Sequence, residues 1–157
     1  MRALEHSQRD IYESHRHRVF SLAFYMTGNE LEAEQLLTDT FMHAFRILSE
    51  PDARTVDDAL IAGLRSRFTL LPAAPASISA DGLIQSGNAR RTDLEEAIQQ
   101  LPALERLAFL LRDVEGYSPE SISQLLEMPQ PEITRTLFSA RIRLRGILAA
   151  QAKERAA

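Results

Sequence analysis

The sequence predicts an all-α fold, with two small helical domains that a flexible linker joins. Apolar residues recur at steps of three and four along most of the chain, which is the spacing of a helix with one buried face. No stretch shows the sustained alternation of a strand. A segment rich in Pro, Gly, Ser and Ala interrupts the helical pattern. We therefore expect domains at residues 1–70 and 92–150 with a linker at 71–91; a single bundle with one long loop is the alternative.

Three helices are expected in the N-terminal domain. The first runs over about residues 4–27 and ends at a glycine. Asn29 is suited to cap the second, because its side-chain oxygen can accept a hydrogen bond from a first-turn N–H group, and the apolar stripe of this helix continues to residue 48. Thr55 is expected to cap a third helix, which continues through residue 68.

The C-terminal domain shows its helix boundaries in its turn and capping residues. A capping-box pattern at residues 92–95 restarts the helices. Gly116 ends one helix, and Ser118 is expected to cap the next, followed by proline at the first helical position. Residues 127–130 break that short helix, and a last helix is expected at about residues 131–148. Two helices joined by a short break are predicted.

The last helix has an apolar stripe, and it carries arginines elsewhere without an acid after its first turn. At 3.6 residues per turn, Arg135, Phe138, Ser139 and Ile142 are expected roughly opposite the stripe. A short break followed by such a helix is typical of a helix-turn-helix DNA reader. The alternative is a solvated amphipathic helix with no DNA-binding role.

Composition excludes several functional classes. The 157 residues include no Cys, which rules out disulfides, thiolate metal sites and a Cys nucleophile and fits a reducing cytoplasm. No apolar run approaches a membrane span, and the N-terminus is too polar for a signal peptide. His15 and His17 face different sides of a helix, so a shared metal is not expected. We expect no catalytic residue, no metal site, no cofactor and no small-molecule substrate. The net charge of −4 means that any DNA contact must come from a local basic patch.

Two stretches carry a resemblance to a known family. HRHRVFSLAFYMTGNELEAEQLLTDTFMHAFR is similar to a family pattern with an aromatic first helix, a glycine turn and Ala-Glu-Asp-Leu-x-Gln-Glu-x-Phe-x-x-Ala-Phe/Trp-Arg. LPALERLAFLLRDVEGYSPESISQLL, followed by SARIRLR, is similar to Leu-Pro-x-x-x-Arg-x-x-Phe-x-Leu-Arg-x-x-Glu-Gly-x-Ser-x-x-Glu-Ile-Ala. In this order, the chain resembles the extracytoplasmic-function sigma factors of the bacterial sigma-70 family, with region 2 and region 4 both represented.

The resemblance implies a subunit that binds the core of RNA polymerase and directs it to specific promoters, with an anti-sigma factor as a further expected partner. By resemblance, the second helix of region 2 docks on polymerase through Glu34, Gln35, Leu36, Asp39, Thr40 and Met42. The last helix of region 4 enters the major groove of the upstream promoter element, with DNA-binding candidates Gln130, Thr134, Arg135, Thr136, Ser139, Arg141, Arg143 and Arg145.

This chain departs from the family pattern where region 2 opens promoter DNA. The family has Trp-Leu-x-x-Ile-x-x-Asn and a basic tract, whereas residues 59–66 read ALIAGLRS and Pro72 stops the helix. Between residues 56 and 72, only Arg65, Arg67 and Phe68 suit contact with a displaced strand. The sequence therefore leaves a second hypothesis open. In it the chain is a sigma-like interaction module with impaired promoter opening, which binds an anti-sigma factor or polymerase.

Overall fold

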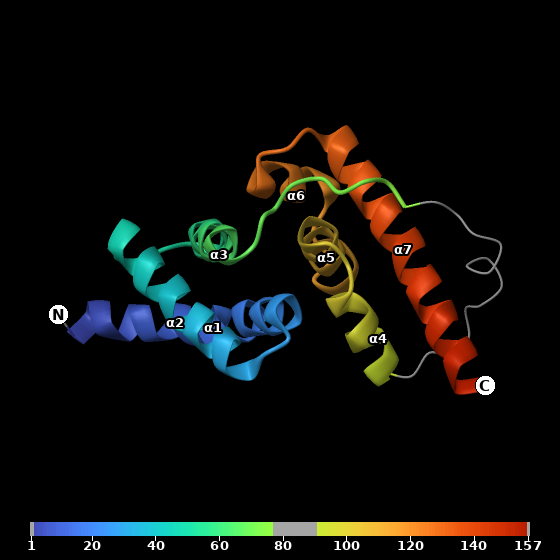
Figure 1. The fold of residues 1–157 in the computed structure, drawn as a ribbon. Coiled ribbons are helices and arrows are strands. Elements are labelled where there is room, and N and C mark those ends of the chain that lie inside the picture. Colours follow the sequence, from blue (N-terminus) through green and yellow to red (C-terminus); the bar gives the residue numbers. More distant parts are fainter. Residues whose placement is uncertain (1, 77–90, 157) are drawn as a thin grey trace. The chain divides into compact units, whose positions relative to one another are not determined.

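The computed structural model describes residues 2–76 and 91–156 and confirms the all-α prediction, since every regular element in these ranges is helical (Figure 1). The elements are α1 (Arg2–Thr27), α2 (Glu30–Ile47), α3 (Ala53–Arg67), α4 (Arg91–Gln99), α5 (Ala103–Phe109), the π-helical turn η2 (Leu110–Val114), α6 (Pro119–Leu126) and α7 (Gln130–Ala156). Within the described ranges, no helix is both long and apolar enough to cross a membrane.

The chain forms two compact units. Unit 1 consists of Met1–Thr69 with Gln124–Glu127, and unit 2 consists of Leu70–Ser123 with Met128–Ala157. The predicted domain boundaries at residues 70 and 92 stay a prediction, and residues 77–90 of the predicted linker lie outside the described residues.

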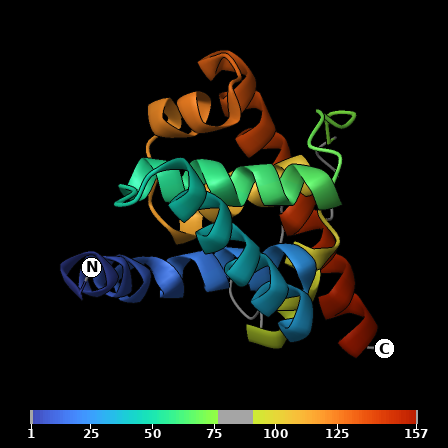
Figure 2. The same ribbon diagram turned by 90° about the vertical axis from the view of Figure 1, so that its left-hand side faces the viewer.

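Helices α1, α2 and α3 pack against one another in unit 1 (Figure 2). The helices α2 and α3 come close together at Gly63, where a Cβ atom would lie 2.6 Å from Cδ1 of the fully buried Leu36. Arg18 of α1 donates to Oδ1 of Asp57 in α3 at 2.9 and 3.2 Å. Asp57 is therefore buried in an ion pair.

The helix starts of unit 1 are fixed by side-chain caps. Asn29 caps α2 as predicted, since its Oδ1 accepts from the N–H of Glu32 at 3.0 Å. The prediction for α3 is wrong by three residues, because Asp52 is the cap and accepts from both the N–H and the hydroxyl of Thr55 at 2.8 Å. A carboxylate competes well for this position because it accepts two hydrogen bonds beside the positive end of the helix dipole.

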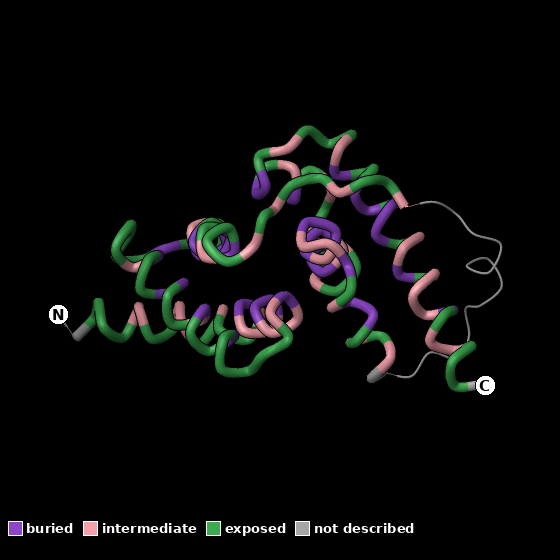
Figure 3. The backbone as a smooth tube through the Cα atoms, viewed as in Figure 1, coloured by how far each residue is buried: buried purple, intermediate pink, exposed green. Residues whose placement is uncertain are grey.

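Unit 2 is built around α5 and α7, which pack together, with α4 against α7. Buried positions recur along one side of α7, as Figure 3 shows. Arg106 of α5 donates to the carbonyl groups of Ile98, Gln99 and Leu101, so its guanidinium closes the C-terminal end of α4. Burial lowers the pKa of Arg106.

Several boundaries in unit 2 follow the prediction and others do not. Gly116 has φ +81°, and the hydroxyl of Ser118 caps α6 by accepting from the N–H of Ser121 at 3.0 Å. The break before α7 is three residues long and contains Glu127 at φ +56°. The helix α4 begins at Arg91, so Thr92 is not its cap. The helix α7 runs two turns beyond the predicted end at residue 148.

Candidate functional site

The exposed side of α7 combines cationic, hydroxyl and aromatic groups. We call Thr134, Arg135, Phe138, Arg141 and Arg145 the α7 face, because all five are exposed on this helix. Phe138 is 61% exposed although it is apolar. Gln130 begins the helix and is exposed. Neither Arg135 nor Arg145 makes a side-chain hydrogen bond or ion pair within the described ranges, so both guanidinium groups face solvent.

Two of the predicted DNA-binding residues are buried. Thr136 and Ser139 are each 8% exposed, so the expectation that Ser139 lies opposite the apolar stripe is wrong. The Ser139 hydroxyl donates to Oε2 of Glu105 in α5 at 3.1 Å and accepts from the N–H of Ala76 at 3.0 Å. The buried side of α7 is therefore wider than its apolar stripe, because the hydrogen-bonded pair of Ser139 and Glu105 extends it.

Two further arginines of α7, Arg141 and Arg143, are held by acids of unit 2. Arg141 donates through two nitrogens to Asp113 at 2.7 and 3.0 Å, and this hydrogen bonding raises the pKa of Arg141. Arg143 donates through Nε to Glu105 at 2.9 Å and through Nη2 at 3.1 Å, which raises the pKa of Arg143. Arg141 stays exposed in its pair, whereas Arg143 lies against a carboxylate that is 2% exposed.

The π-helical turn at the end of α5 sets the position of Asp113. The N–H of Glu115 donates to the carbonyl of Leu110 at 2.9 Å, a five-residue step that widens the helix. Asp113 pairs with Arg141 across 28 residues of sequence. The sequence contained no local signal for either feature. Phe138, in contrast, could have been chosen from the sequence as an apolar residue on the arginine side.

The exposed side of α2 forms a second candidate surface. We call Leu31, Glu34, Gln35, Thr38, Asp39 and Met42 the α2 ridge, because all are exposed on this helix. Leu31 is 65% and Met42 is 50% exposed. Four of the predicted polymerase contacts lie on the ridge, but Leu36 and Thr40 are buried, so the structure contradicts their accessibility. They face α1 and α3 because they continue the inward stripe of the helix.

Two grooves flank the α2 ridge. One has a volume of about 510 Å³ and is lined by Tyr12, Arg16, His17 and Phe20 of α1 and by Glu34, Leu37 and Thr38 of α2. The other, of about 380 Å³, is lined by Leu31, Glu34, Gln35, Thr38, Asp39 and Arg67. The ridge thus presents two acids between two apolar residues, and each flanking groove contains an arginine.

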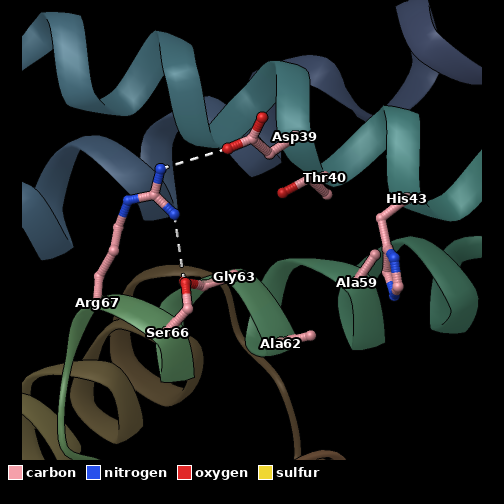
Figure 4. A pocket seen from close by; sticks show the side chains of 8 residues that line it. All are labelled: Asp39, Thr40, His43, Ala59, Ala62, Gly63, Ser66 and Arg67. Carbon is pink, nitrogen blue, oxygen red and sulfur yellow. Dashed lines mark hydrogen bonds and ion pairs between the residues drawn. The ribbon is translucent and has the colours of Figure 1, made fainter.

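A smaller groove of about 230 Å³ separates α2 from α3 and is lined by small residues of α3, as Figure 4 shows. At its edge, Arg67 donates to Asp39 at 3.4 Å and to the carbonyl of Gly63 at 3.3 Å. The Thr40 hydroxyl is buried and has no hydrogen-bond partner among the described residues. This groove lies where the family resemblance expects a tryptophan and an asparagine.

Comparisons with known proteins agree with this arrangement. Residues 91–144 match the family described as Sigma-70, region 4. The matched residues include the helix-turn-helix and most of the α7 face.

The relatives extend the comparison to the rest of the chain. The chain is 28% identical to the ECF RNA polymerase sigma factor SigE of Mycolicibacterium smegmatis over 94% of its own length, and it spans 63% of that protein. It shares a fold, with a TM-score of 0.61 and 19% identity, with a chain in the co-crystal structure of the sigma factor RpoE and the anti-sigma factor NepR from Bartonella quintana. That match covers 94% of this chain and 98% of the other. The chain is therefore similar in sequence to an extracytoplasmic-function sigma factor along most of its length, and it shares the fold of a sigma factor of known structure.

Proposed function

We propose that this protein is an extracytoplasmic-function sigma factor that binds the core of RNA polymerase and directs it to specific promoters. The α7 face is the observation that carries the proposal. It is an exposed cationic side of the second helix of a helix-turn-helix, and no acid occurs between residues 133 and 153. The role is one of binding rather than catalysis, and it takes place in the cytoplasm, where polymerase and DNA are found.

The α7 face supplies the groups that reading DNA requires. Arg135 lies in the first turns of α7, where a recognition helix meets base edges, and its guanidinium can donate two hydrogen bonds to guanine. Thr134 offers a hydroxyl to a base edge or phosphate. Phe138 offers an apolar surface to a thymine methyl group. Arg141 and Arg145 suit phosphates, which position the helix without reading sequence.

The α2 ridge supplies the proposed polymerase contact. Two apolar side chains, Leu31 and Met42, offer area for burial at the two ends of the ridge, and Glu34 and Asp39 between them suit a partner helix that carries basic groups. Leu31 joins the candidate contacts because of its exposure, although the family resemblance did not indicate it.

A matched pair of charge reversals tests the α2 ridge. The double variant E34K/D39K should bind core polymerase about tenfold more weakly or worse, since two attractive contacts become repulsive. The control E5K/E50K makes the same charge change at two exposed residues of unit 1 outside the ridge. Co-purification and fluorescence titration with labelled core enzyme give the affinities, and circular dichroism checks that helicity is intact. Equal binding by both double variants would remove the ridge from the proposal.

Promoter direction itself is tested by in vitro transcription. The purified chain and core polymerase are given a genomic library, and the 5′ ends of the transcripts are mapped. A shared upstream element among these starts is the expected result. Binding to core enzyme without any chain-dependent start would favour the second candidate function described next.

The second candidate is a sigma-like module that binds polymerase or an anti-sigma factor but opens promoters poorly. The small-residue groove beside α3 favours it, because Ala59, Ala62, Gly63 and Ser66 offer no aromatic group for an unpaired base. The structure from Bartonella quintana pairs a sigma factor with an anti-sigma factor. By that likeness, we propose an anti-sigma factor as a partner of this chain in either role.

A further inference from the structure

Residues 74–76 belong to unit 2, and two helix side chains of that unit hold their backbone. The N–H of Ala76 donates to the Ser139 hydroxyl at 3.0 Å, and Arg143 donates to the carbonyl of Ala74 at 2.7 Å. Figure 1 shows this segment, in light green, running beside the N-terminal half of α7. Ala74 is exposed, so its backbone rather than its side chain is recognised.

A buried carboxylate orients the Ser139 hydroxyl and the Arg143 guanidinium, the two groups that hold the segment. Glu105 is 2% exposed and accepts from the Ser139 hydroxyl at 3.1 Å and from two nitrogens of Arg143 at 2.9 and 3.1 Å. Because the Ser139 proton goes to Glu105, its oxygen is left to accept an N–H group. Because Nη2 of Arg143 has two protons, it can serve Glu105 and a backbone carbonyl together. We call Glu105, Ser139 and Arg143 the cradle.

The cradle matches two backbone groups of the segment. Ser139 and Arg143 are four residues apart on α7 and therefore lie on the same side of the helix. The carbonyl of Ala74 and the N–H of Ala76 both reach this side of α7. One acceptor and one donor on the helix thus meet the N–H of Ala76 and the carbonyl of Ala74. This pairing gives a hydrogen-bond partner to both helix side chains and to both backbone groups. Burial of the Glu105 carboxylate without such donors would cost free energy of folding.

We propose that the cradle is a docking site for the chain's own residues 74–76 and not part of the DNA-contacting surface. At 3.6 residues per turn, Ser139 and Arg143 lie roughly 100° or more around α7 from Phe138 and Arg145. The exposed α7 face can therefore meet DNA while the cradle holds the segment. Arg143 serves as an anchor for the chain instead of as a phosphate contact.

Docking shortens the free chain between α3 and α4. The helix α3 ends at Arg67, and α4 begins at Arg91. With the segment docked, the chain from Arg67 to Ala74 can span about 25 Å when fully extended. With the segment released, the chain from Arg67 to Arg91 can span about 80 Å. Release of residues 74–76 would therefore free a longer stretch of chain between these two helices.

Proline substitution tests the docking, because proline removes one N–H and leaves the carbonyl. A76P removes the donor to Ser139, whereas A74P keeps the carbonyl that Arg143 uses. Either substitution makes a Pro-Pro pair with Pro75, so the two variants are matched in stiffness. Since the chain has no native Cys, L71C places a single nitroxide label at an exposed position beside the segment.

Electron paramagnetic resonance then reports whether the segment is held. In the otherwise unaltered chain and in A74P, the spectrum should contain a component from a slowly moving label. In A76P this component should be absent. A label as mobile in the unaltered chain as in A76P would overturn the proposal, and so would equal loss of the slow component in A74P and A76P.

Discussion

Arg135 and Arg145 both face solvent on α7, but their places along the helix give them different expected roles. Arg135 is near the N-terminal end, where base edges are reached, and Arg145 lies further along, where the phosphate backbone passes. Arg135→Ala should cost about 1–3 kcal/mol at the cognate upstream element and relax preference at one base pair. Arg145→Ala should weaken binding to all duplexes and lower the salt slope by about one. Fluorescence anisotropy on cognate and scrambled duplexes at several salt concentrations measures both effects.

Equal losses on cognate and scrambled DNA from the two variants would show that Arg135 is only a phosphate contact. The double variant E105Q/R143M provides the control, because it removes the cradle's ion pair without leaving a buried charge. If Arg143 anchors the chain, as inferred above, this variant keeps the salt slope of the unaltered protein.

His15 gives unit 1 a dependence on pH that can be measured. Its Nδ1 accepts from Arg18 at 2.8 Å, and partial burial, followed by the charge of Arg18, lowers the pKa of His15 below 6.5. The unfolded chain therefore binds the proton more readily, and the stability due to neutral His15 is present above pH 6.5 and is lost as pH falls through the lowered pKa. His15→Gln should have a flatter melting temperature between pH 7 and pH 5 than the unaltered chain, because Gln can still accept from Arg18. Parallel pH curves for the two proteins would contradict this assignment.

At the scale of single residues, the sequence was most informative where the partner is close in the chain. Asn29 and Ser118 cap helices through hydrogen bonds to residues three positions on, and both were predicted. Ser139 and Asp113 have partners 34 and 28 residues away, and no local pattern indicates them. A helical wheel divides residues into apolar and polar sides. It therefore assigned Ser139 to solvent although a buried acid on a neighbouring helix holds it.

The start of α3 depends on one exposed carboxylate. Asp52 accepts from the backbone N–H of Thr55, which is the main cause of its lowered pKa, and from the Thr55 hydroxyl. Since the folded-state pKa lies below 3.8, the cap stabilises the fold above that pH, and its contribution is lost as pH falls through the lowered pKa. Asp52→Ala should therefore lower the melting temperature at neutral pH, and the difference should shrink in acid. Asp58→Ala, in the next turn of the same helix, is the control.

Thermal melts followed by circular dichroism at pH 7 and at pH 3 test this cap. The variant Thr55→Ala distinguishes a cap at Asp52 from the cap at Thr55 that the sequence predicts. If Asp52 is the cap, loss of the Thr55 hydroxyl removes one of two bonds and should destabilise less than Asp52→Ala. A larger effect for Thr55→Ala would restore Thr55 as the cap.

At the scale of elements, the type and order of the helices were predictable and their ends were less so. The apolar stripe of α7 weakens after Leu148, so a helix end was expected there. The helix continues to Ala156 because the residues beyond it are mostly strong helix formers, and Arg155 pairs with Asp93 of α4. The π-helical turn at Leu110–Val114 has no sequence signature, because it depends on how α5 meets the chain that leads into α6.

At the scale of the whole molecule, DNA binding depends more on the local charge of α7 than on the net charge of the chain. The chain carries −4 overall, but the acids closest to α7 are engaged with specific arginines: Asp113 with Arg141 and Glu105 with Arg143. Arg135 and Arg145 extend beyond these pairs. A cationic surface on an acidic protein gives DNA binding that is sensitive to salt but modest on random duplex, which suits a subunit that reaches DNA together with polymerase.

The expected capacity for promoter opening follows from the surface of α3. Trapping an unpaired base needs aromatic stacking, and holding the displaced strand needs cationic groups. Along α3, Ala62 and Ser66 are exposed, and Arg67 is paired with Asp39. Arg54 is paired with Asp58, and Phe68 is only partly exposed. If the chain acts as proposed, its holoenzyme should bind linear duplex promoters but open them poorly.

Permanganate reactivity of promoter thymines measures this opening directly. With reconstituted holoenzyme, we expect weak reactivity on linear duplex and strong reactivity on a template with a pre-melted segment, because the pre-melted DNA removes the unstacking cost that α3 cannot offset. Substituting A62W restores an aromatic group at an exposed position of the same helix and should raise reactivity on duplex DNA if stacking is what is missing. Leu48→Trp, on an exposed position outside α3, is the matched control. Strong reactivity of the unaltered chain on linear duplex would show that the small-residue surface suffices for opening, and it would leave the promoter-opening sigma factor as the only supported role.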